Sequence, residues 1–207
     1  MAKYTCADCR QCRREGQKLF LKSNERCTSK KCAMERRPVP PGQHGTGRKK
    51  ASEYSVQLRE KQKVKRAYGL LEKQFHSYYE EAERLRGVTG ENMLALIERR
   101  LDNVAYRMGI GASRAQSRQI VNHGHLTVNG KAVDIPSYQV KVGDVIAIAE
   151  SKKDNTMFKE LRGAHIVMPK WLEFDTETLV GKILDNPKRE DIDLNINEQL
   201  IVELYSK

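Results

Sequence analysis

The sequence of 207 residues lacks any apolar run of 18 residues, the length at which a membrane-spanning helix becomes a candidate. It also lacks a segment that resembles a signal peptide. We therefore expect a cytoplasmic protein that has no membrane partner. Cysteine is absent after residue 32, and a chain of this length can bury a core without disulfide bonds. Thiols that cluster in a reducing compartment indicate metal ligands rather than disulfides.

Patterns for catalysis are missing as well. The five histidines show neither metal-ligand nor catalytic-triad spacing: His44, His76, His123, His125 and His165. Gly42 and Gly47 have the separation of a Walker A loop, but Arg48 and Lys49 follow where that motif needs Lys and then Ser or Thr. We therefore expect neither an enzyme nor a small-molecule substrate.

Positive charge is concentrated at the N-terminus. Residues 1–50 carry 14 basic and four acidic side chains, so nearly all of the net charge of +11 belongs to this quarter of the chain. Such a basic block attracts polyanions. The segment lacks the apolar face of a membrane-surface helix, which favours nucleic acid as the partner.

Four cysteines in this basic segment have the spacing of a zinc site. Cys9 and Cys12 form a Cys-x2-Cys pair, and Cys27 and Cys32 follow as Cys-x4-Cys. Two such pairs supply the tetrahedral thiolates of a structural zinc ion, and metal binding would then provide much of the segment's folding free energy. We expect the first pair on a tight turn and a short β segment at residues 19–21 between the pairs. Cys6 leaves an iron–sulfur cluster open as the alternative, and free thiols as a third.

Breaker residues at positions 38–47 predict a linker that ends in Arg48, Lys49 and Lys50. The linker could be a solvated connection, or its basic end could bind phosphates. Charge alone does not decide between them.

Apolar spacing predicts helices over about 53–68, 71–86 and 91–108. Ser52 is a helix cap at the start of the first, and Gly69 and Gly87 end the first two.

A further helix should begin after Ser113, because Ser113 and Gln116 form a capping box, and should stop at Gly124. With the preceding helix it would make a helix-turn-helix-like unit whose N-terminal end can meet a phosphate. A strand at 126–128, the turn Asn129-Gly130 and strands around Val140–Ile148 then predict an antiparallel sheet.

Several segments carry a resemblance to a known family. The runs Gly111-Ala-Ser-Arg114, Ile120-Val-Asn-His-Gly124 and Val128-Asn-Gly-Lys131 closely resemble the small RNA-binding domain named after the fourth protein of the small ribosomal subunit. The flanking segments Pro41-Gly-Gln-His-Gly45 and Asn197-Glu-Gln-Leu-Ile-Val-Glu-Leu-Tyr205 resemble the bacterial ribosomal family itself, in its cysteine-bearing branch.

The resemblance implies a primary binder of small-subunit (16S) rRNA that holds a junction in the 5′ domain and nucleates assembly of the subunit body. It also implies a position where mRNA enters the ribosome, with Arg48, Lys49 and Lys50 matching the family's basic residues there. Contacts with ribosomal protein five and neighbouring small-subunit proteins, and through them a contribution to translational accuracy, are implied in the same way.

The expected fold is α+β. Residues 1–50 would form a basic zinc-knuckle arm, 51–98 a helical domain completed by the tail 170–207, and 99–161 a small inserted RNA-binding domain of two helices on a short antiparallel sheet. The expected zinc ligands are Cys9, Cys12, Cys27 and Cys32. The expected RNA-binding residues are Arg10, Arg13, Arg14, Arg36, Arg37, His44, Arg59, Lys61, Lys63, Lys65, Arg66, Arg100, Ser113, Arg114, Arg118, His123 and Lys131.

Two other classes of protein fit the sequence less well. An RNA-modifying or tRNA-aminoacylating enzyme can carry the same small domain, but the rest of this chain is too short for a catalytic domain. A zinc-dependent transcription factor would need a base-reading helix beside the metal and a dimer element, and the sequence offers neither.

Overall fold

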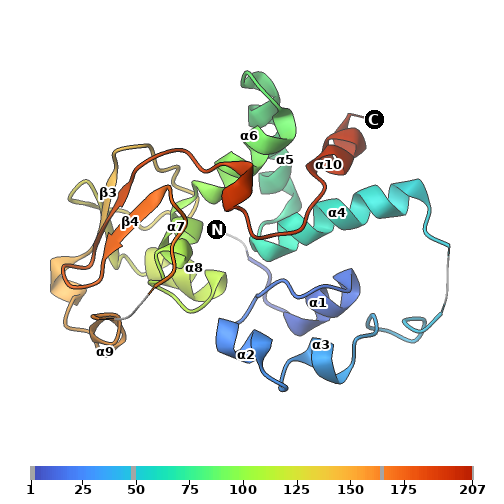
Figure 1. Ribbon diagram of the computed structural model, residues 1–207, viewed down its shortest axis with the longest axis horizontal. Helices are drawn as coiled ribbons and strands as arrows, with labels where there is room; N and C mark the ends of the chain where they lie inside the picture. Colours follow the sequence, from blue (N-terminus) through green and yellow to red (C-terminus); the bar gives the residue numbers. More distant parts are fainter. Residues whose placement is uncertain (1–2, 48–49, 164–165, 207) are drawn as a thin grey trace. The chain divides into compact units, whose positions relative to one another are not determined.

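The computed structural model describes residues 3–47, 50–163 and 166–206. The chain forms two compact units: the first comprises residues 1–93 and 193–207, and the second comprises 94–192. The course of the chain through its helices and strands can be followed in Figure 1. Within the described ranges, no helix combines the length and the apolar character needed to cross a membrane.

The first unit begins with three short helices, α1 (Cys9–Glu15), α2 (Asn24–Thr28) and α3 (Ala33–Arg36). The chain at residues 17–23 is irregular, and Phe20 has a positive φ of 49°. The expected β segment at 19–21 is therefore wrong. Leu19 is fully buried, so this stretch serves as a short apolar connection rather than as a strand.

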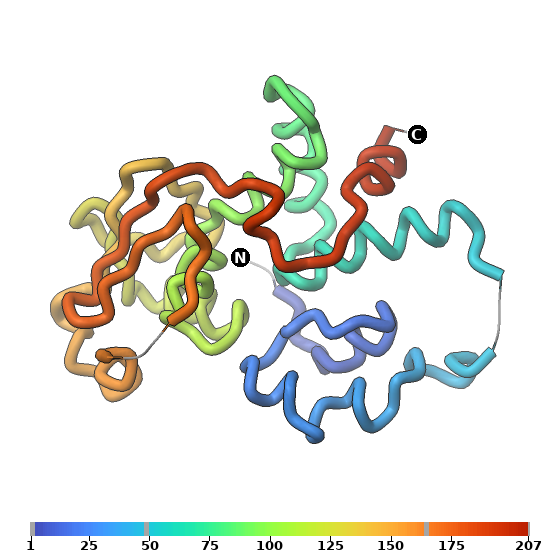
Figure 2. The backbone as a smooth tube through the Cα atoms, in the orientation of Figure 1, coloured from blue at the N-terminus to red at the C-terminus, as the bar shows by residue number. Residues whose placement is uncertain are grey.

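Longer helices follow in the same unit. They are α4 (Glu53–Ala67), α5 (Glu72–Arg84) and, near the end of the chain, α10 (Glu198–Tyr205). The Ser52 side chain accepts a hydrogen bond from the backbone N–H of Ser55, which confirms the expected helix start. Helix α10 packs on α4 although more than 130 residues separate them, and the tube in Figure 2 shows this return of the chain.

The expected helix over 91–108 is two helices, α6 (Thr89–Glu98) and α7 (Leu101–Arg107). Arg100 adopts an extended conformation, with φ −69° and ψ 137°, and forms an isolated β-bridge with Gln139. This bridge interrupts the helical hydrogen bonds, even though the apolar spacing continues through the break.

The second unit places α7 and α8 (Arg114–Asn122) together beside a sheet. The strands of that sheet are β1 (Leu126–Val128), β2 (Lys131–Ala132), β3 (Val145–Ile148), β4 (Leu172–Asp175) and β5 (Val180–Ile183). Their order is β2-β1-β3-β5-β4, and every pairing is antiparallel. Short helical turns lie between and after the strands: η1 (Glu150–Lys152), α9 (Thr156–Lys159) and η2 (Arg189–Asp191). The α+β class is confirmed.

Strands β4 and β5 correct the expected domain division. The tail from 170 was expected to complete the helical domain, but residues 170–192 belong to the second unit and only 193–207 belong to the first. The physical reason is burial: Leu172, Phe174 and Ile183 point into the core that also holds Trp171 and Leu101. Pairing of β5 with β3 makes this hairpin an integral part of the sheet.

Candidate nucleic-acid interface and metal centre

The four thiols expected to bind zinc line one small cavity of about 20 Å³. Cys9 and Cys12 lie one turn apart on α1 rather than on the tight turn that we expected, Cys27 lies in α2, and Cys32 is the N-cap of α3. Cys6 is exposed and is not among the residues that line the cavity. The three short helices therefore bring together the two pairs that the spacing singled out.

The pKa of Cys12 in this cavity is governed first by burial and then by its polar and thiol neighbours. Burial raises the pKa of Cys12, a hydrogen bond with the Leu19 backbone opposes the rise, and the Cys9 and Cys27 thiols add to it. Among the residues that the structure describes, no group of three or more His, Cys, Asp or Glu side chains has an arrangement that could hold a metal ion. The sulfurs share a cavity but do not form a finished tetrahedron.

A buried carboxylate organises the basic groups of α1 and α4. The side chain of Glu15 has no exposed surface, and its Oε1 accepts hydrogen bonds from Arg59, at 3.1 Å, and from Arg66. Burial raises the pKa of Glu15, and the two guanidinium groups partly offset this rise. Glu15 thus fixes the orientation of two expected RNA ligands without removing both of their charges.

The lysines of α4 are less available than expected. Lys61 is only 8% exposed and pairs with Glu72, which also accepts from Lys65 at 2.7 Å and from the Tyr205 hydroxyl at 3.0 Å. Lys63 pairs with Glu60 within the same helix. This pairing argues against a contact of Lys61 with RNA, because its ammonium group helps to join α4, α5 and α10.

The arm keeps its charge at the surface. Arg13 is half-buried, and its Nε donates to the carbonyl of Val39 at 2.9 Å. The remaining described candidates of the arm are exposed: Arg10, Arg14, Arg36, Arg37, His44 and Lys50. Arg48 and Lys49, which the resemblance places where mRNA enters, lie outside the described residues.

Two arginines of the second unit are buried structural groups. Arg100 is 1% exposed and Arg118 is 6% exposed. Arg100 donates to both carboxylate oxygens of Asp102, at 3.0 and 2.6 Å, and Arg118 donates to Asp102 at 3.4 Å. Both were expected to bind RNA, and their burial argues against direct contact with a phosphate, because Asp102 already engages their guanidinium groups.

The start of α8 agrees better with expectation. The Ser113 hydroxyl accepts from the Gln116 N–H at 3.3 Å, whereas the Gln116 side chain accepts from Ala112 rather than from Ser113. The guanidinium of Arg114 is held by Asn103 at 2.9 Å and lies 4.5 Å from the centre of the Tyr106 ring.

Farther along the second unit, His123 and Lys131 are exposed, so both remain accessible to a partner.

The acidic and polar residues that position these cations were not predicted from the sequence. Glu15, Glu72 and Asn103 each hold a basic side chain that the expected site includes. For Glu15 the partners are 44 and 51 positions away. No local pattern could have found these pairs, because they exist only once the helices pack.

Comparison with known proteins bears on the same two units. The model described as "Ribosomal protein S4/S9 N-terminal domain" matches residues 3–98, and the model described as "S4 domain" matches residues 99–146. The small ribosomal subunit protein uS4 of Ruminiclostridium cellulolyticum is 63% identical over the full length of both chains. The chain belongs to this family. The uS4 proteins of Caldicellulosiruptor bescii and Clostridioides difficile are 60% and 59% identical, again over the full length of both chains.

Membership of the uS4 family confirms the resemblance found in the sequence. The chain is a structural protein of the small ribosomal subunit with RNA-binding domains, and it is not an enzyme. The expected location in the cytoplasmic ribosome is confirmed by the same relatives. The family's second domain begins at residue 99, the start that was expected for the RNA-binding domain.

Proposed function

We propose that the chain is a primary binder of 16S rRNA that holds a helical junction in the 5′ domain and nucleates assembly of the subunit body. The observation that supports this most directly is the exposed set Arg10, Arg14, Arg36 and Arg37, for which no carboxylate partner is found in the described part of the chain. RNA helices hide base edges in a deep and narrow major groove. Guanidinium groups on a shaped arm suit recognition of backbone and junction shape.

A filter-binding titration tests this proposal. The full chain should bind a transcript of the small-subunit rRNA 5′ domain more tightly than a random duplex RNA of equal length. Affinity should fall with salt by about 0.7 to 0.9 log units per phosphate contact per log unit of salt. Replacement of Arg36 and Arg37 by Gln should reduce that slope, whereas Lys188→Gln, an exposed cation of the second unit, should not. Equal affinity for the two RNAs would contradict the proposal.

The second part of the proposal concerns the position of the arm on the ribosome. The exposed Lys50 ends the basic run that the resemblance places where mRNA enters, beside ribosomal protein five. Subunits that carry Arg48, Lys49 and Lys50 replaced by Ala should give less cross-linking to photoreactive mRNA on the incoming side. Binding to the isolated 5′-domain transcript should change much less. Unchanged cross-linking would remove the mRNA role.

A role in translational accuracy is proposed through contact with ribosomal protein five. The comparison is between ribosomal protein five in small subunits that contain this chain and ribosomal protein five alone. The full chain should protect ribosomal protein five from limited proteolysis, and loss of this protection should accompany a higher rate of stop-codon readthrough. A change in stop-codon readthrough without a change in the protection of ribosomal protein five would contradict a role for this contact.

The cavity of the four thiols supports zinc as a structural cofactor. A small cavity lined by all four thiols suits a single ion held by four sulfurs. Cys9, Cys12, Cys27 and Cys32 would hold the ion, and binding would draw their sulfurs inward into a tetrahedron. The zinc would supply a fixed crosslink among α1, α2 and α3, because a segment of this size has little core of its own.

Metal analysis of anaerobically purified protein tests this cofactor. We expect one zinc per chain and no acid-labile sulfide. Cys27→Ser should lose the zinc, and Cys6→Ser, the matched control, should keep it. Iron with sulfide, or equal zinc loss in both variants, would overturn the four-thiol assignment.

A further inference from the structure

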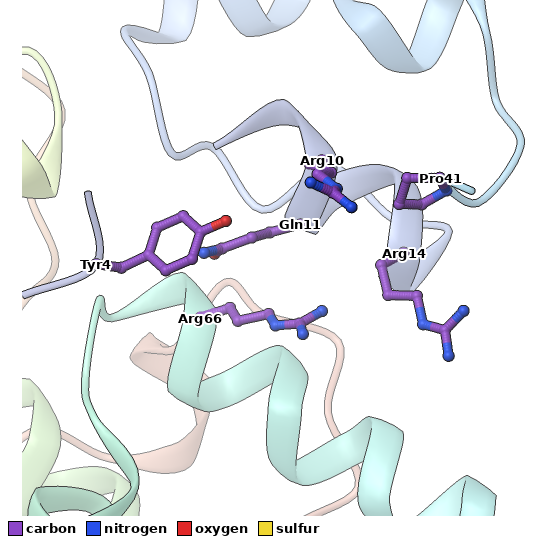
Figure 3. A pocket seen from close by; sticks show the side chains of 6 residues that line it. All are labelled: Tyr4, Arg10, Gln11, Arg14, Pro41 and Arg66. Carbon is purple, nitrogen blue, oxygen red and sulfur yellow. The ribbon is translucent and has the colours of Figure 1, made fainter. Parts of the chain in front are cut away.

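The first unit contains an open cavity of about 270 Å³ between the start of the chain, α1 and α4. Its lining is Tyr4, Arg10, Gln11, Arg14, Pro41 and Arg66. In Figure 3 the ring of Tyr4 lies beside the side chain of Gln11, Arg10 lies above Gln11 and Arg66 below it, and the guanidinium group of Arg14 points away from the Tyr4 ring. An aromatic face and a set of cations thus share one cavity.

The charges around this cavity favour an anion. No acidic residue is among those that line it, whereas three arginines are. Arg66 is held by the buried carboxylate of Glu15, so its direction is fixed before any ligand arrives. Arg10 and Arg14 are exposed, and no carboxylate partner for either is found among the described residues. Bidentate recognition of a phosphate is the chemistry that such guanidinium groups perform best.

Size and the aromatic ring narrow the ligand further. The cavity volume lies just below the range of about 300 to 1,000 Å³ in which drug-sized ligands bind. The cavity therefore has more room than a single inorganic phosphate needs. Tyr4 is 41% exposed, so part of this residue is accessible to a base. Gln11 is 9% exposed and offers a neutral amide for a hydrogen bond with a base or sugar.

We propose that this cavity holds one unstacked nucleotide of the bound RNA, with its base on Tyr4 and its phosphodiester between Arg10, Arg14 and Arg66. The proposal rests on the rRNA-binding function proposed above and adds a site to it. Unstacked bases of junctions and loops are recognised by aromatic side chains in this way. Stacking on Tyr4 gives affinity without demanding a particular base, because every base has a π face.

The first experiment measures binding of the 5′-domain transcript by variants of the full chain. Tyr4→Ala should lower the affinity about tenfold, since stacking of one base contributes about 1 to 3 kcal/mol. Tyr4→Phe should stay within about twofold of the parent chain. Replacing Arg10 and Arg14 by Gln should lower the salt slope by about 0.7 to 0.9, as expected for the loss of one phosphate contact.

A double-mutant cycle then asks whether ring and cations hold the same nucleotide. The loss in affinity for Tyr4→Ala combined with Arg14→Gln should be at least about threefold smaller than the product of the single losses, because either change alone already releases the nucleotide. The matched control combines Tyr4→Ala with Lys31→Gln, an exposed cation of the same arm that does not line the cavity. That pair should lose affinity multiplicatively.

The outcomes separate this inference from the broader function. If the parent chain binds the transcript tightly and Tyr4→Ala matches it, or if both pairs are multiplicative, the nucleotide site is refuted and rRNA binding stands. If the parent chain does not distinguish the transcript from random duplex RNA, both proposals fail together. All changed side chains are exposed, so loss of folding is not expected, and circular dichroism of each variant checks this.

Discussion

The buried carboxylate of Asp102 allows a direct test of how buried ion pairs stabilise the second unit. Asp102 is 5% exposed and accepts from the guanidinium groups of Arg100 and Arg118, which are themselves buried. Removing the acid in Asp102→Ala leaves two buried cations without their carboxylate. Breaking a buried pair in this way costs about 3 to 5 kcal/mol, much more than loss of an exposed pair.

Urea unfolding followed by tryptophan fluorescence gives the readout. Trp171 is the chain's single tryptophan, it is 2% exposed, and it lies in the core that includes Leu101. Its emission therefore reports unfolding of residues 94–192 specifically, which avoids treating two units as one transition. With a urea dependence of about 1 to 3 kcal/mol per molar, the midpoint should fall by at least about 1 M.

The control for this experiment is Asp134→Ala. Asp134 is an exposed acid of the same unit, and its replacement should shift the midpoint by no more than about 0.3 M. If Asp102→Ala and Asp134→Ala unfold at the same urea concentration, the reasoning from buried charge is refuted. The same result would remove the argument from burial against Arg100 and Arg118 as RNA ligands.

Three further changes test other parts of the fold. Burial raises the pKa of Glu72, but hydrogen bonds from Lys61, Lys65 and Tyr205 outweigh it and lower the pKa from 4.5 to about 2, so the stabilisation is complete above pH 4.5 and lost as pH falls towards 2. Because Glu72 is 47% exposed, Glu72→Gln should lower the free energy of unfolding by only about 1 kcal/mol at pH 7, and by nothing near pH 2. Unfolding followed by circular dichroism measures both values. An equal loss at the two pH values would exclude the charge effect. Gly111→Ala would place a Cβ 2.8 Å from the backbone nitrogen of Ser117 in α8. The free energy of unfolding, followed by Trp171 fluorescence, should therefore fall by about 1 to 3 kcal/mol. An unchanged urea midpoint would contradict the close approach. In the same assay, Ser113→Ala should lower the free energy of unfolding by about 1 kcal/mol and Ser113→Gly by only a few tenths. Equal losses for the two variants would argue against capping by the Ser113 hydroxyl.

Local signals predicted the elements that depend on nearby residues. The caps at Ser52 and Ser113 mark the true starts of α4 and α8, and the turn Asn129-Gly130 joins β1 to β2 as expected. These features lie within about four residues of their partners. Their outcome is set by short-range hydrogen bonds and backbone preference, which the sequence displays directly.

Features that depend on pairing between residues far apart in the sequence were not predicted. The break at Arg100 depends on Gln139, which is remote in sequence, and apolar spacing cannot reveal such a bridge. Strand β4 does carry an alternating pattern, with Leu172 and Phe174 buried and Glu173 exposed. That pattern predicts a strand, but it does not say that β5 will pair with β3 rather than leave the hairpin with the helical unit.

The basic residues show why a site is harder to predict than a fold. Lys61, Arg100 and Arg118 look like their exposed counterparts in the sequence, yet each is buried against an acid. Glu72, the partner of Lys61, follows it by 11 residues as the first residue of α5, and the contact forms only when the chain turns between α4 and α5. Net charge predicts the class of partner, whereas tertiary packing decides which cations remain to meet it.

This distribution of paired and unpaired cations implies an unequal share of RNA affinity between the two units. In the second unit, ion pairs with Asp102 and Glu98 engage Arg100, Arg118 and Arg107, which stabilises the fold and removes these charges from the surface. The arm contains four acids in its 50 residues, and one of them, Glu15, is buried where it orients arginines rather than shielding the surface. Since salt dependence counts the phosphates that a protein neutralises, most of the slope should come from the arm. The second unit would then contribute shape and rigidity more than charge.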